Sequence, residues 1–341
     1  MSEEFNLIEQ YFKPLSQPLN EGELGIGDDG AIVETQPAKQ LVVVTDTMVE
    51  GVHYPKQTDP YDIGWKLVAV NLSDLAAMGA EPKSYSLAVT LPSVNAEWLE
   101  SFALGLQRWA IPLSIPLIGG DTTKGQQTVL TLSAIGEIPA GLGILRKNAK
   151  VGDWILVSGL LGSAGLGLKW VLEDREGVAD TEPVQRLNRP VPKVALGQAL
   201  RGIANSMIDI SDGLVADLGH ICTASNCSAW IGLDALPISE AVADYIDVAG
   251  EQGYQLPLAA GDDYELCFTV SPEKLEEVLS LAQQLGEPVS VIGRMGQPHT
   301  RSAVWVCERL EQCEGIVSLE HSNAIGTPAS AYLTKAGYQH F

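Results

Sequence analysis

The chain has 341 residues, of which 45% are hydrophobic and 19% charged, an ordinary globular composition with enough apolar residues for two domains. Acidic residues outnumber basic residues by 43 to 21, and the formal net charge of −22 argues against a nucleic-acid-binding surface. Five cysteines without a CxxC pair indicate neither a disulfide framework nor a thiolate zinc site.

The N-terminal segment MSEEFNLIEQYF is acidic and amphipathic. It lacks the basic start and the apolar run of a secretory signal, and no apolar stretch of the chain reaches the length that spans a bilayer. We therefore expect a cytoplasmic protein that binds neither membrane nor nucleic acid.

Strand and helix patterns alternate through the first half of the chain. The β-branched run at 40–47 predicts a strand that ends at Asp46, and residues 60–79 predict a helix that begins at Pro60 and closes at Gly79. The further predictions are a strand at 84–92, a helix at 95–111 with Asn95 as N-cap, a short strand at 115–123 that breaks at two glycines, and a strand at 128–138.

A basic stretch at 144–154, with a turn at Gly152, marks a change of character. We place a domain boundary near residue 140, giving domains 1–140 and 141–341. In the second domain we expect strands at 154–159, 206–211, 229–235, 264–270 and 289–295, and helices at 165–174, 192–204, 212–225 and 271–286. This mixture predicts an α/β or mixed α+β fold.

Familiar nucleotide and hydrolase motifs are missing. GIGDDG at 25–30 has the spacing of a dinucleotide fingerprint, but strand-like AIVE follows it and two carboxylates occupy the loop, so we interpret the match as spurious. The chain has no GxxxxGK[ST], no HRD/DFG pair, no GxSxG and no HExxH. The glycine turn at 158–167 could bring helix N–H groups to an anion or serve close helix–strand packing.

Aspartates recur at predicted strand ends and in glycine turns. Each alone is explained as a turn former or a helix N-cap, and Asp212 before GLVADL is a good N-cap candidate. Together they form a set of hard oxygen donors of the kind that holds Mg²⁺ beside phosphates. The positions are Asp28, Asp29, Asp46, Asp74, Asp121, Asp209, Asp212, Asp262 and Asp263.

The motifs GIGDDGA, TDTMVEGVH, AVNLSDLAAMGAEP, IGGDTTKG, DISDGL and AGDDYEL, in this order, resemble the thiamine-monophosphate kinase family. That family is part of the superfamily of aminoimidazole ribonucleotide synthetase. The resemblance runs from about residue 5 to the C-terminus. It implies a two-domain synthetase-like fold, a homodimer, and ATP-dependent phosphorylation of thiamine monophosphate to thiamine diphosphate by direct in-line transfer, with several Mg²⁺ ions and no catalytic side chain.

The resemblance also implies roles for individual residues. The implied metal ligands are Asp29, Thr45, Asp46, Asp74, Asp121, Asp209 and Asp212; the implied ATP contacts are Gly120, Asp121, Arg146 and Ser211; and the implied thiamine-phosphate contacts are His53, Asp262 and Tyr338. The chain departs from the family at Asp262, where the family usually has glutamate, so the carboxylate is shorter by one methylene.

Other interpretations compete with these assignments. On their own, His53 is explained as a turn residue, Arg146 as a solvated charge and Tyr338 as part of a terminal tail. Another ATP-dependent enzyme of the superfamily is the nearest rival, although a selenide–water dikinase would need a reactive cysteine near the N-terminal glycine loop and the first cysteine is Cys222. A non-catalytic acidic cation-binding protein is the alternative of a different class.

Overall fold

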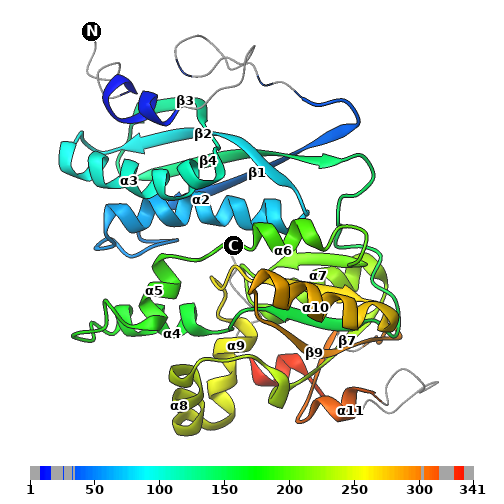
Figure 1. Ribbon diagram of the computed structural model, residues 1–341. Coiled ribbons are helices and arrows are strands. Elements are labelled where there is room, and N and C mark those ends of the chain that lie inside the picture. The colour runs from blue at the N-terminus through cyan, green and yellow to red at the C-terminus, as the bar shows by residue number, and fades with distance from the viewer. Residues whose placement is uncertain are drawn as a thin grey trace. The chain divides into compact units, whose positions relative to one another are not determined.

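The computed structural model describes residues 8–16, 26, 33, 35–300, 303–314 and 326–333 (Figure 1). The predicted site residues Asp29 and Tyr338 lie outside the described residues. The chain divides into two compact units. Unit 1 holds the described residues up to Leu75 together with Ala80–Gly141, and unit 2 holds Ala76–Gly79 and the described residues from Leu142 onward.

Unit 1 contains a four-stranded sheet in the order β1-β4-β2-β3. Its strands are β1 (Lys39–Val49), β2 (Glu81–Leu91), β3 (Leu117–Lys124) and β4 (Val129–Pro139). Strand β4 pairs antiparallel with β1 and β2, whereas β2 and β3 are parallel. Alternate residues such as Leu130 and Leu132 are buried, because neighbouring side chains of a strand point to opposite faces.

Two long helices accompany this sheet (Figure 1): α2 (Pro60–Ala77) and α3 (Ala96–Leu113). The predicted N-cap is confirmed, since the Asn95 side chain accepts a hydrogen bond of 3.2 Å from the Trp98 N–H. The helices cross at Gly64 and Gly105, where a Cβ on Gly105 would lie 2.1 Å from the Tyr61 carbonyl oxygen. Only glycine permits so close an approach. Short helices at Ile8–Phe12 and Lys13–Leu15 precede these elements.

Unit 2 contains a seven-stranded sheet in the order β11-β10-β7-β9-β5-β8-β6, in which β7 and β10 are parallel and the other pairs are antiparallel. Its strands are β5 (Trp154–Ser158), β6 (Ser206–Asp209), β7 (Ser228–Gly232), β8 (Leu266–Val270), β9 (Val289–Gly296), β10 (Val304–Cys307) and β11 (Thr327–Pro328). Its α-helices are α4 (Ser163–Leu172), α5 (Glu182–Asn188), α6 (Val194–Ala199), α7 (Leu214–Ser225), α8 (Glu240–Ala249), α9 (Gln255–Ala259), α10 (Leu275–Leu285) and α11 (Leu310–Glu314).

The core of unit 2 lies where α7 packs on the sheet. Leu214, Leu218 and Ile221 of α7 belong to one buried cluster with Ile155 of β5 and Ile208 of β6. All five cysteines are buried, and none of them forms a disulfide. Among the helices that the structure describes, none combines the length and the apolar content needed to cross a membrane.

Three local predictions are wrong. Strand β1 does not end at Asp46 but continues to Val49, because its pairing with β4 extends as far as Val129. Strand β3 does not break at its glycines; its register with β2 shifts between Leu117 and Gly119, and the pairing then continues through Gly120 to Lys124. Asp212 does not cap α7, whose N-cap is Gly213 without a side-chain hydrogen bond. For the two strands, pairing across the sheet overrides the local turn preference; at α7, the Asp217 side chain accepts the Asp212 N–H.

Candidate active site

Unit 1 presents two adjacent predicted metal ligands in the middle of β1. Thr45 and Asp46 are consecutive strand residues, so their side chains point to opposite faces of the sheet. The Thr45 hydroxyl lies 2.7 Å from the Ser133 hydroxyl on β4 and is exposed, whereas Asp46 is half-buried. The Thr45 hydroxyl therefore lies on the face of the sheet opposite to the Asp46 carboxylate.

The Gly120–Asp121 pair lies on β3, at the other edge of the same sheet. Gly120 allows the backbone to pass very close to β2, because a Cβ there would lie 1.9 Å from the Leu87 carbonyl oxygen. Strands β4 and β2 separate Asp46 from Asp121, and three inter-strand spacings amount to roughly 14 Å. The two carboxylates cannot coordinate the same ion.

Asp74 comes from a helix rather than from a strand end. It is a half-buried residue in the last part of α2. Within the described ranges, no group of three or more His, Cys, Asp or Glu side chains is close enough to hold one metal ion. The predicted ligands of unit 1 are thus distributed over three elements.

In unit 2, strand β6 ends at Asp209 and leads through the turn Ser211–Gly213 into α7. Asp217, in the first turn of α7, holds this turn: its Oδ2 accepts hydrogen bonds of 3.0 Å from the N–H groups of Ser211 and Asp212. The structure thus brings Asp209, Ser211 and Asp212 together at one end of the helix.

Asp217 is not among the site residues predicted from the sequence. Its position in the first turn of the helix that follows DISDG is a signal that could have identified it. The residue is 3% exposed, and burial, followed by the charge of Asp209, raises the pKa of its carboxyl to about 7. Two carboxyl groups buried this close together create a negative potential that a cation would relieve.

The predicted substrate residue Asp262 lies in a loop at 261–265, between α9 and β8, with an unusual backbone. Gly261, Asp262 and Tyr264 have φ angles of 74°, 61° and 49°. This left-handed region costs a non-glycine residue up to about 1–2 kcal/mol, less for aspartate, and such strain concentrates at functional sites.

This loop packs directly on the Ser211–Asp212 turn. The Asp262 N–H donates to the Ser211 carbonyl oxygen over 2.8 Å. A Cβ on Gly261 would lie 2.4 Å from that same oxygen. Within unit 2, the predicted substrate residue and the predicted ATP contact are therefore in backbone contact.

The remainder of the GDDYE segment serves the fold around this loop. Both carboxyl oxygens of Asp263 lie 3.0 Å from the Gly162 N–H, so Asp263 provides the hydrogen-bond acceptor at the N-terminus of α4. Glu265 is buried, accepts a hydrogen bond from the Ser158 hydroxyl and lies 3.6 Å from the ammonium of Lys193. Burial raises the pKa of Asp263 well above its usual range and also raises that of Glu265.

His53 lies in the turn after β1 and is half-buried. Its Nδ1 accepts a hydrogen bond of 3.0 Å from the Val49 backbone N–H. The backbone N–H of His53 donates to the Val49 carbonyl oxygen. The imidazole orientation is thus fixed by the strand end.

Arg146 is exposed and lies away from the Ser211–Asp212 turn. Its carbonyl oxygen accepts a hydrogen bond from the Ser225 hydroxyl at the last residue of α7. Ser211 and Asp212 precede the first turn of that helix, whose 12 residues span about 18 Å. The Arg146 backbone therefore does not lie beside Ser211, the other predicted ATP contact of unit 2.

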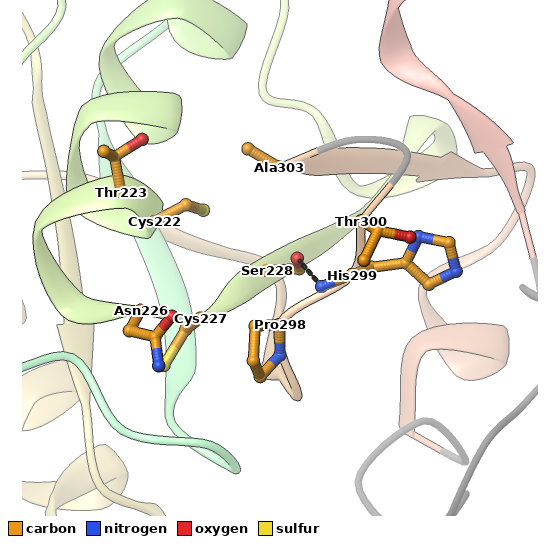
Figure 2. Close-up of a pocket in the computed structure, with 9 residues that line it drawn as sticks. All are labelled: Cys222, Thr223, Asn226, Cys227, Ser228, Pro298, His299, Thr300 and Ala303. Carbon is orange, nitrogen blue, oxygen red and sulfur yellow. Dashed lines mark hydrogen bonds between the residues drawn. The ribbon is translucent and has the colours of Figure 1, made fainter.

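A cavity of about 460 Å³ opens at the same end of α7 as Arg146 (Figure 2). Burial raises the pKa of Cys222 to about 12, so this lining thiol is protonated at neutral pH and is not a nucleophile. The cavity lining contains no predicted site residue. Its residues are Cys222, Thr223, Asn226, Cys227, Ser228, Pro298, His299, Thr300 and Ala303.

The sequence matches known families over most of its length. Residues 27–138 match the N-terminal domain, and residues 150–306 the C-terminal domain, of AIR synthase related protein. Thiamine-monophosphate kinase of Escherichia coli strain K12 is 46% identical over 297 residues, which cover 86% of this chain and 90% of that protein. The chain belongs to the thiamine-monophosphate kinase family.

Solved structures of thiamine-monophosphate kinases share the fold. That from Stenotrophomonas maltophilia K279a has a TM-score of 0.78 at 41% identity and covers 84% of this chain and 91% of that one. AaThiL complexed with AMPPCP and TMP has a TM-score of 0.72 at 29% identity and covers 94% and 95%. The family resemblance and the mixed α/β synthetase-like fold are thus confirmed, and the chain is a phosphotransferase.

Proposed function

We propose that this member of the thiamine-monophosphate kinase family transfers the γ-phosphoryl group of ATP to thiamine monophosphate, giving thiamine diphosphate and ADP. The hydrogen bond from the Asp262 N–H to the Ser211 carbonyl oxygen carries the proposal, since it joins the predicted substrate loop to the predicted ATP turn. Family membership and the relative complexed with AMPPCP and TMP support the same pair of substrates.

The predicted ligand set fits Mg²⁺. It consists of six aspartates and Thr45, and carboxylate oxygens are the hard donors that Mg²⁺ prefers; burial, followed by the charge of Asp209, raises the pKa of the neighbouring Asp217. Bound Mg²⁺ would offset the repulsion between the two polyanionic substrates and withdraw charge from the phosphoryl group. The residues that would hold it are Asp29, Thr45, Asp46, Asp74, Asp121, Asp209 and Asp212. The spacing of Asp46 and Asp121 favours several ions over one.

The side chains of the enzyme bind and orient the substrates. In this proposal Gly120, Asp121, Arg146 and Ser211 contact ATP, and His53, Asp262 and Tyr338 contact thiamine monophosphate. The acceptor phosphate oxygen is already anionic at neutral pH, so direct in-line attack needs no general base and no covalent intermediate. Positioning supplies the contribution of the protein to the rate.

The decisive experiment is incubation of the purified protein with ATP, Mg²⁺ and thiamine monophosphate, with thiamine diphosphate and ADP separated by chromatography. We expect the two products in equal amounts, and neither when thiamine monophosphate or Mg²⁺ is omitted. ADP formation without thiamine diphosphate would reassign the chain to another acceptor, and a folded protein that forms neither product would contradict the kinase proposal.

The cytoplasmic location and the homodimer stay predictions. Strand β1 exposes Leu41 and Val43, whose exposed fractions are 47% and 64%. Apolar side chains this exposed on a sheet edge are a surface that a second copy could cover, which supports the homodimer.

A further inference from the structure

The loop at 261–265 adopts its strained backbone only while its neighbours hold it. On one side, the N–H groups of Asp262 and Tyr264 donate to the carbonyl oxygens of Ser211 and Ile210, each over 2.8 Å. The Ile210 N–H donates in turn to the Glu265 carbonyl oxygen over 2.8 Å. These backbone bonds align the loop with the end of β6.

On the other side, the side chain of Asp263 holds the loop to the N-terminus of α4. Gly162 is the N-cap of α4 and has no side chain with which to cap its helix. Asp263 accepts the Gly162 N–H instead, with both carboxylate oxygens at 3.0 Å, across 101 residues of sequence. A carboxylate at a helix N-terminus is favoured by the exposed N–H groups and by the helix dipole.

The geometry points to Asp263 as a positioning residue for the kinase reaction: its bond to Gly162 locks the left-handed loop so that Asp262 meets the substrate beside the Ser211–Asp212 turn. Both side-chain oxygens of Asp263 contact the Gly162 N–H. Asp263 therefore acts on the substrate through Asp262, its neighbour in the chain. This inference rests on the proposed function for the identity of the substrate and for the contact between Asp262 and that substrate.

Glu265, another carboxylate of the same segment, has different partners. Glu265 is held from the opposite end of the segment by the Ser158 hydroxyl and by Lys193, which also contacts Glu287 at 3.0 Å. With Glu265 fixed on one side and Asp263 on the other, the backbone of Asp262 and Tyr264 has little freedom to relax. Loss of the Gly162 bond would release the end nearest Asp262.

The test compares Asp263→Ala, which removes the acceptor, with Asp263→Asn, whose amide oxygen can still accept the Gly162 N–H. The exposed Asp244 of α8 supplies the control variant Asp244→Ala. In Asp263→Ala we expect amide hydrogen exchange at both Gly162 and Asp262 to accelerate by about tenfold or more, and in Asp263→Asn we expect little change.

Steady-state kinetics supply the second readout. In Asp263→Ala, kcat/KM for thiamine monophosphate should fall by about tenfold to a hundredfold, the size expected for loss of a hydrogen bond to a charged group, and Asp263→Asn should recover most of it. The KM for ATP should change much less than the KM for thiamine monophosphate. If Asp263→Ala fails to fold, Asp263→Ser replaces it with the same readouts.

Two results would overturn the inference. One is faster exchange at Gly162 with no change at Asp262, which would make Asp263 a helix cap and nothing more. The other is Asp263→Asn behaving like Asp263→Ala, which would assign the role to charge rather than to the hydrogen bond. The exchange measurements need no turnover, so they decide the matter even if the wild-type protein forms no thiamine diphosphate.

Discussion

Asp46→Asn is expected to lower kcat by about a hundredfold or more, because it removes the charge of a predicted Mg²⁺ ligand and almost no volume. Asp46 lies in the middle of β1 in register with the buried Leu132, so an amide of the same shape keeps the strand pairing. The measurement is kcat at saturating ATP and thiamine monophosphate over a Mg²⁺ titration. We expect the half-saturating Mg²⁺ concentration to rise as well.

The matched control for this variant is Asp180→Asn, which neutralises an exposed carboxylate outside the predicted site. Its kcat should equal that of the wild-type protein, since a surface charge far from the reaction contributes little. Both variants should keep the wild-type melting temperature. An Asp46→Asn enzyme with near-normal kcat and Mg²⁺ dependence would remove Asp46 from the metal ligands.

Gly261→Ala is expected to reduce kcat/KM by about a hundredfold and to destabilise unit 2 by about 2–4 kcal/mol, since it combines strain with overpacking. Gly261 has a φ of 74°, and the new Cβ would lie 2.4 Å from the Ser211 carbonyl oxygen. The loop or the Ser211 turn must move to accept it. Thermal unfolding and steady-state kinetics with both substrates measure the two effects.

Gly286→Ala separates backbone strain from the clash. Gly286 has a φ of 68° at the C-cap of α10, and a Cβ there would meet nothing within 4 Å. It should lose only the roughly 1 kcal/mol that a left-handed conformation costs alanine, with unchanged kinetics. If Gly261→Ala lost no more activity than Gly286→Ala, the contact between the 261–265 loop and Ser211 would not matter for the reaction.

The mixed α/β class, most of the helices and strands, and the family can all be predicted from the amino-acid sequence. Local signals suffice for these: the Asn95 cap, the β-branched run of β1 and the apolar periodicity of α3 all act over a few residues. The family is inferred from six acidic and glycine-rich motifs that follow one another in a given order. This inference needs no knowledge of the distances between residues. The roles of the individual site residues stay predictions.

Which of these residues are neighbours depends on how the chain folds in three dimensions. Strand order put Asp46 and Asp121 at opposite edges of one sheet, although both belong to similar acidic motifs. Asp263 accepts the N–H of Gly162, a residue that lies 101 positions away in the chain. At the start of α7, Asp217 and not Asp212 accepts the backbone hydrogen bonds. The strand order and the Asp263–Gly162 contact arise between distant segments, whereas Asp217 acts on residues five and six positions before it; both outweigh the weak turn and cap preferences of single aspartates.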